Sequence, residues 1–101
     1  MSNIVRKGDF LVFENIHGDV TEFFISSMDM DLNNCYVGST GRKKVHGCFG
    51  FPLRTGHYYA PGDDYWVNRK ATLEERDRFI RWLEEKGHKV NLNTMEITLN
   101  R

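Results

Sequence analysis

The chain lacks the sequence features that mark several protein classes. It has no apolar run of membrane-spanning length, and its formal net charge is zero. Zero net charge gives no overall field that would attract nucleic acid or a membrane surface. The chain contains no Gly-x-Ser-x-Gly, no phosphate-binding glycine loop and no His-Glu-x-x-His, so nothing in it predicts an enzyme or a cofactor. Because the N-terminus carries no hydrophobic secretory segment, we expect a cytoplasmic protein.

What is present suits one globular domain. Hydrophobic residues make up 40% of the 101 residues and aromatic residues 13%, which is enough for a core and argues against disorder. There is no internal repeat, low-complexity segment or interdomain linker. We therefore expect a single domain over residues 1–101, with a β-rich body at 1–70 and a helix plus a terminal hairpin at 71–101.

The strongest local signal is a helix near residues 73–86. Thr72 and Glu75 have the spacing of a capping box, and Gly87 is placed to end the helix. Apolar positions recur at helical spacing and predict a buried stripe. Its members are Leu73, Arg76, Phe79, Ile80 and Leu83, with Trp82 on the flank. The alternation after residue 88 predicts a terminal hairpin with its turn at Asn93-Thr94.

The first seventy residues read as short strands separated by turns. Strands are predicted at 10–14, 20–26, 35–38, 45–51 and 65–67, with turns near 15–19, 40–43 and 61–64. Strands followed by a helix indicate an α+β class, and four to six short antiparallel strands suit a partly open SH3-like barrel as the body.

The helix and hairpin segment also resembles a recurrent tail. The pattern is Arg69-x-Ala-Thr-x-Glu-Glu, followed by a phenylalanine, Gly87-His88, a turn with asparagine and a last apolar strand. It resembles the tail of small uncharacterised proteins of Bacteroides-type gut bacteria and their phages, whose β-barrel-like body opens with Lys-x-Gly-Asp. Here Lys7-Gly8-Asp9, preceded by Arg6, stands in that place. The resemblance covers residues 69–99 and implies a bacterial or phage setting without an assigned activity.

The two cysteines are the sharpest pair of reactive residues. A hairpin closing symmetrically on residues 40–43 would place Cys35 opposite Cys48, with His46 on the same face. Reduced, half-buried thiols without a metal are the favoured interpretation. The alternatives are a zinc site, which would also need His57 or another ligand, and a cross-strand disulfide.

Charge is unevenly distributed along the chain. No acidic residue occurs between Asp31 and Asp63, whereas bases and aromatic residues are frequent there. Two hypotheses follow: a non-enzymatic module that binds a protein partner or its own copy, or an accessory protein that binds single-stranded nucleic acid through the basic segment 42–58. The candidate binding residues are Arg42, Lys43, Lys44, Arg54, His57, Tyr58, Tyr59 and Trp66.

Overall fold

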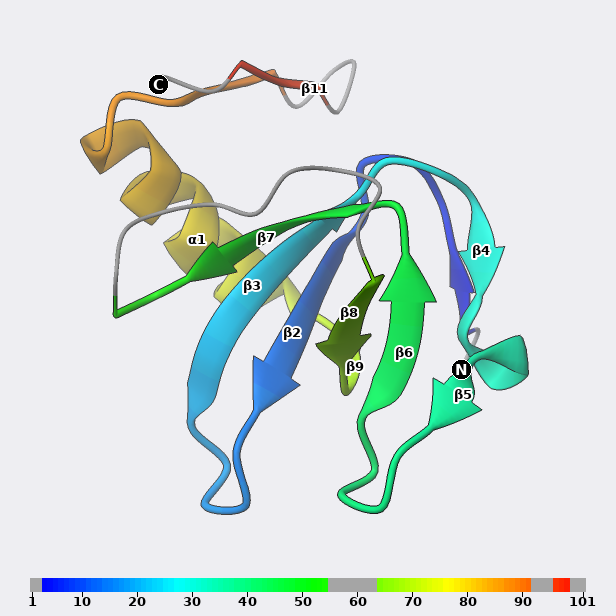
Figure 1. Ribbon diagram of the computed structural model, residues 1–101. Helices are drawn as coiled ribbons and strands as arrows, with labels where there is room; N and C mark the ends of the chain where they lie inside the picture. The colour runs from blue at the N-terminus through cyan, green and yellow to red at the C-terminus, as the bar shows by residue number, and fades with distance from the viewer. Residues whose placement is uncertain (1–2, 55–63, 92–95, 99–101) are drawn as a thin grey trace. The chain divides into compact units, whose positions relative to one another are not determined.

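The structure is a computed structural model that describes residues 3–54, 64–91 and 96–98 (Figure 1). It consists of short, mostly antiparallel strands and one α-helix, which confirms the predicted α+β class. The chain divides into two compact units, residues 1–70 and 71–101. The division falls where the apolar pattern changes from a period of two to one of about 3.6.

The first unit is organised around a hairpin of β2 (Phe10–Glu14) and β3 (Val20–Ser26). Its turn is held by Asn15, whose side-chain oxygen accepts hydrogen bonds from the backbone N–H groups of His17 and Asp19 at 2.9 and 3.1 Å. Strands β7 (Cys48–Pro52) and β9 (Arg69–Lys70) complete a four-stranded sheet in the order β7-β3-β2-β9. The predicted hairpin is therefore confirmed.

A second sheet has the order β5-β6-β8, formed by β5 (Tyr36–Val37), β6 (Lys43–His46) and β8 (Asp64–Val67). A small pair, β1 (Ile4–Val5) with β4 (Met30–Asp31), and the 3-10 turn η1 (Leu32–Asn34) complete the unit. The described strands do not close into a barrel, and they outnumber the predicted four to six. Asp64, predicted in a turn, is the first residue of β8; residues 61–63 lie outside the described part of the chain.

One hydrophobic core joins the strands of the first unit. Its buried residues come from β1, β2, β3, η1, β6, β7 and β8, so both larger sheets contribute to it. They are Val5, Leu11, Phe24, Leu32, Val45, Cys48, Tyr65 and Val67. The core explains why strands as short as two residues keep their places, since an isolated two-stranded pair is at best marginally stable in water.

Around Gly47 the structure differs from two sequence predictions. The segment 45–51, predicted as one strand, is broken at Gly47, whose φ is +84°, and β6 and β7 belong to different sheets. In the hairpin of β5 and β6, Tyr36 lies opposite Lys44. Cys48 belongs to β7 and lies opposite Ser26 of β3. The predicted pairing of Cys35 with Cys48 across one hairpin is therefore wrong.

The second unit contains the predicted helix, α1 (Leu73–Glu85). Its capping box is formed in both directions: the Glu75 N–H donates to Thr72 Oγ1 at 3.2 Å, and the Thr72 N–H donates to Glu75 Oε1 at 2.8 Å. Phe79, Ile80 and Leu83 are buried as predicted. Leu73, which was expected to share their face, is 70% exposed.

A terminal hairpin follows the helix. Strand β10 (Lys89–Asn91) pairs antiparallel with β11 (Glu96–Thr98), which confirms the predicted hairpin. The predicted turn residues Asn93 and Thr94 lie outside the described residues.

Candidate functional site

The candidate binding residues do not form one basic surface. Lys43 and Lys44 are neighbours in β6, so their side chains leave opposite faces of the sheet. Lys43 lies opposite the fully buried Val67, whereas Lys44 lies opposite Trp66 on the outer face. Arg54 is exposed in the turn after β7. His57, Tyr58 and Tyr59 lie outside the described residues.

Acidic side chains from elsewhere in the sequence lie close to the basic segment. The carboxylate of Asp64 accepts from Lys44 Nζ at 3.1 Å and contacts His46 Nδ1 at 3.2 Å. Hydrogen bonds from Lys44 and His46 hold the pKa of Asp64 below its usual value. Arg42 is close enough to Glu22 to lower the pKa of that carboxyl, although burial of Glu22 has the larger, opposite effect. The charge imbalance seen along the sequence is therefore reduced in space.

The outer face of the β5-β6-β8 sheet carries a row of three side chains. Tyr36, Lys44 and Trp66 lie opposite one another across the three strands. The rings of Tyr36 and Trp66 have their centroids 6.0 Å apart with an interplanar angle of 59°. Tyr36 is 70% exposed and Val37 is 53% exposed. Tyr36 and the half-buried Trp66 form an apolar surface on this outer face, which we call the aromatic face, whereas Val37 lies opposite Lys43 on the other face.

The aromatic face is only partly readable from the sequence. Trp66 was among the candidate residues, but Tyr36 was not. No local signal in the sequence singles out Tyr36. In the structure, a side chain at Gly38 would place its Cβ 3.2 Å from the Trp66 ring. The glycine thus allows the ring to lie close to the backbone beyond β5.

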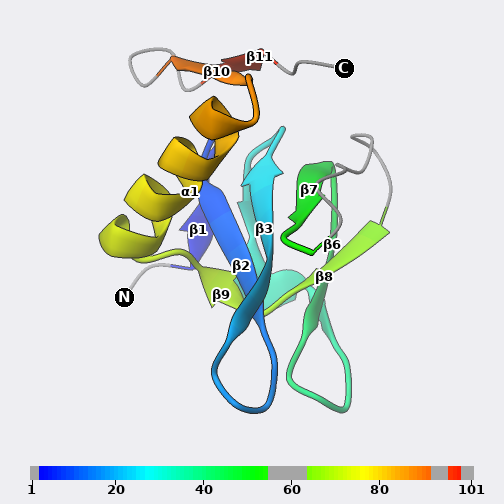
Figure 2. The ribbon, with the colours of Figure 1, turned by 90° about the vertical axis from the view of Figure 1, so that its left-hand side faces the viewer.

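A second feature of the first unit is a cavity of about 280 Å³ at the tips of two hairpins. The loops after β2 and after β5 reach the same end of this unit (Figures 1 and 2). Side chains from both loops line the cavity, which we call the tip hollow. Its lining residues are Phe13, Glu14, Asn15, Ile16, Thr40, Arg42 and Asn68.

The two thiols are free and lie at one core. Cys48 is fully buried, and burial raises its pKa to about 12. Cys35 packs against the same core cluster, and burial raises its pKa as well. No group of three or more His, Cys, Asp or Glu residues that could hold a metal ion occurs in the described ranges. The zinc alternative gains no support from this arrangement.

Comparisons of the chain with protein-family models, with curated proteins and with solved structures found no match. Within the part of the chain that the structure describes, no helix is both long and apolar enough to cross a membrane.

Proposed function

We propose that this protein is a non-enzymatic interaction module that binds a protein partner through the aromatic face. The observation that carries the proposal is the exposed ring of Tyr36 beside the ring of Trp66. Val37, the next residue of β5, points to the opposite side and is also exposed, so neither face of β5 is covered by the residues that the structure describes. Tyrosine and tryptophan are enriched among the residues that dominate the energy of protein interfaces.

The charges around this face favour a protein over a nucleic acid. Phosphate binding requires cations that are free to replace counterions. The ammonium group of Lys44 is paired with Asp64, and Lys43 belongs to the opposite face of β6. One observation still supports single-stranded nucleic acid as the second candidate: Lys44 lies between two aromatic residues that can stack on bases.

Further parts of the proposal rest on the sequence. The tail resemblance supports a bacterial or phage origin, and the absence of a catalytic motif in the sequence supports a non-enzymatic role. A cytoplasmic location and an SH3-like, partly open arrangement of the antiparallel body belong to the same proposal.

The test is photo-cross-linking in cells that express the protein, with a photoreactive residue replacing Lys44, which lies between Tyr36 and Trp66. We expect a specific partner to be captured, and Tyr36→Ser or Trp66→Ala to abolish its capture because they remove the aromatic contact. A photoreactive residue at Arg81, exposed on α1, is the matched control. Capture that survives both substitutions in folded protein would refute the aromatic face as the contact.

The nucleic-acid candidate is tested by fluorescence anisotropy with a single-stranded oligonucleotide over a range of salt concentrations. If this candidate is right, binding weakens steeply with salt, and Lys43→Glu with Lys44→Glu lowers both the affinity and the salt dependence. No binding at low salt would remove it.

A further inference from the structure

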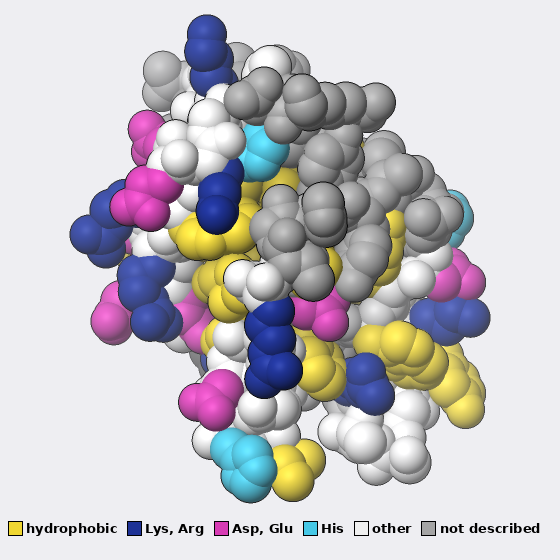
Figure 3. Space-filling view, turned by 60° about the vertical axis from the view of Figure 1, so that its left-hand side comes forward, with side chains coloured by type: hydrophobic (Ala, Val, Ile, Leu, Met, Phe, Trp, Pro, Cys, Tyr) yellow, Lys and Arg dark blue, Asp and Glu magenta, His cyan; other side chains and the backbone are white. Residues whose placement is uncertain are grey.

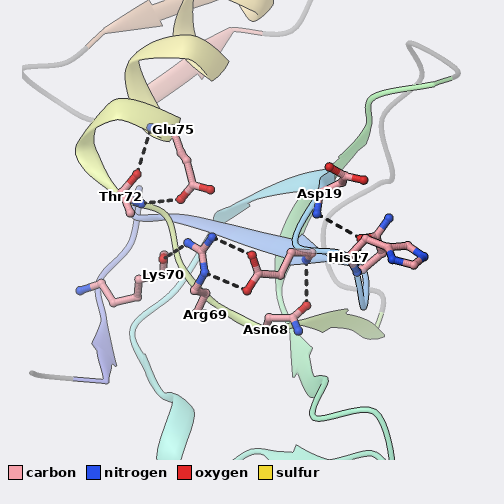
Figure 4. Close-up of polar contacts among 9 residues, drawn as sticks. His17, Asp19, Asn68, Arg69, Lys70, Thr72 and Glu75 are labelled. Carbon is pink, nitrogen blue, oxygen red and sulfur yellow. Dashed lines mark hydrogen bonds and ion pairs between the residues drawn. The ribbon is translucent and has the colours of Figure 1, made fainter.

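The polar groups of the tip hollow are nearly all hydrogen-bond donors. The side-chain oxygen of Asn15 is occupied by two backbone N–H groups, and that of Asn68 accepts from the Glu14 N–H at 3.0 Å. These bonds fix the orientation of both carboxamides, so the other end of each is an NH₂ group that only donates. Figure 4 shows the Asn68 nitrogen turned away from its bond to Glu14.

Arg42 adds a third donor and a positive charge. Its guanidinium carbon lies 4.6 Å from the centre of the Phe13 ring, and its Nε donates to Thr40 Oγ1 at 3.1 Å. These two contacts fix the side chain. Neither terminal nitrogen of Arg42 has a hydrogen bond to the described residues. A guanidinium stacked on a ring can still donate in its own plane.

The acidic residue that lines the tip hollow is already paired. Arg69 binds both carboxylate oxygens of Glu14, from Nε at 3.4 Å and from Nη2 at 3.1 Å (Figure 4). Its negative charge is therefore largely balanced. The remaining acid near Arg42 is Glu22, whose half-buried carboxyl has a raised pKa and so carries its charge less readily than an exposed one.

The walls of the tip hollow are partly apolar. Phe13 forms one side, and Ile16, 89% exposed, forms another. An isoleucine this open to solvent at a hairpin tip does not contribute to the core. Figure 3 shows, on one side of the molecule, hydrophobic side chains open to solvent next to Lys and Arg side chains. The volume of about 280 Å³ lies just below the range of roughly 300–1,000 Å³ for small-molecule pockets, so it suits a small ligand.

We propose that the tip hollow binds a carboxylate attached to a small apolar group. The carboxylate accepts from the free nitrogens of Arg42 and from the carboxamides, because a site that offers donors selects a ligand that offers acceptors. The apolar group lies against Phe13 and Ile16. Two sources supply this chemistry, the free C-terminus of a polypeptide that ends in an apolar residue and a small organic acid. The site is separate from the aromatic face and does not depend on it.

The test is an NMR titration of the whole chain with N-acetyl-leucine. We expect saturable shifts of the side-chain NH₂ signals of Asn15 and Asn68 and of the Arg42 Nε–H. N-acetyl-leucinamide has the same shape without the charge, and we expect it to bind at least tenfold more weakly. N-acetylglycine, which lacks the apolar group, should also bind more weakly. A short peptide ending in leucine and the free acid 4-methylpentanoate then distinguish the two sources.

Variants of two residues give opposite expectations. Arg42→Gln should weaken N-acetyl-leucine at least tenfold, because it removes a charge-assisted hydrogen bond. Glu22→Gln should tighten binding, because it removes the competing charge near Arg42. Arg54→Gln, another exposed basic residue outside the tip hollow, is the matched control and should change nothing. If Arg42→Gln fails to fold, Arg42→Lys keeps the charge without the planar fork and should still weaken binding.

Three results would each overturn the proposal. The first is the absence of any saturable shift with N-acetyl-leucine. The second is equal binding of N-acetyl-leucinamide, and the third is an affinity that Arg42→Gln leaves unchanged in folded protein. Each is independent of the aromatic face, since Trp66→Ala is expected to leave binding in the tip hollow unchanged.

Discussion

Replacing Gly47 with alanine tests the point at which the chain passes from one sheet to the other. Gly47 has a φ of +84°, and a Cβ there would lie 2.8 Å from Met28 Sδ and 3.2 Å from Ser27 Oγ. The Gly47 carbonyl also accepts hydrogen bonds from the backbone N–H and the hydroxyl of Ser27. The substitution therefore combines backbone strain with a steric clash.

A second substitution, at Gly41, separates the backbone strain from the steric clash. Gly41 has a similar φ of +79°, but an added Cβ there meets nothing within 4 Å. A left-handed conformation costs a residue with a Cβ roughly 1–2 kcal/mol, and restriction of the unfolded chain returns about 0.4–1 kcal/mol. Gly41→Ala should thus lower the free energy of unfolding by about 1 kcal/mol. Gly47→Ala should cost only about 1 kcal/mol more, at the lower end of the range for overpacking, because the exposed Met28 side chain can move away from the new Cβ.

Urea denaturation followed by circular dichroism measures both variants. The double variant Met28→Ala with Gly47→Ala isolates the clash: in the Met28→Ala background, the cost of Gly47→Ala should approach that of Gly41→Ala. Ser27 Oγ remains near the new Cβ and accounts for any small difference in the free energy of unfolding that is left. A Gly47→Ala variant no less stable than Gly41→Ala would show that Met28 and Ser27 do not pack against Gly47.

Two further predictions concern the helix and the thiols. Leu83→Ala should lower the free energy of unfolding by about 2–5 kcal/mol, because Leu83 is fully buried. Thr72→Ala should lower it by only about 0.5–2 kcal/mol, because it removes the helix cap. Urea melts that give Thr72→Ala the larger loss would contradict the assignment of the buried stripe. Cys48 should react with a thiol reagent only as the protein opens, because it is buried with a pKa raised to about 12. Cys35 should react faster at neutral pH, and equal rates in folded protein would contradict this.

The elements that the sequence predicted well are those fixed by local signals. The capping box of Thr72 and Glu75 and the glycine after the helix act within a few residues, so α1 is readable from its own sequence. The hairpin of β2 and β3 is equally local, because Asn15 organises a turn between two apolar runs. Leu73 is the exception, since helical spacing alone does not say how far the buried stripe extends.

The break at Gly47 could not be predicted in this way. Residues 45–51 have the composition of one strand, and nothing local distinguishes a glycine inside a strand from one that ends it. Tertiary pairing determines where the strand ends: Val45 pairs with Tyr65, whereas Cys48 pairs with Ser26 of a different sheet. The error in the cysteine register followed directly from treating β6 and β7 as one strand.

The same dependence on register decides what the basic segment can bind. Two adjacent lysines form one positively charged surface only where the backbone brings both side chains to the same side. In a β-strand, adjacent side chains point to opposite faces. In β6 they separate, Lys43 toward the buried Val67 and Lys44 toward Trp66, and Asp64 then pairs with the outer one. The outer face keeps its aromatic character and loses most of its positive charge. This chemistry supports the protein contact that we propose. The guanidinium of Arg42, whose terminal nitrogens have no hydrogen bond to the described residues, lies at the hairpin tips instead.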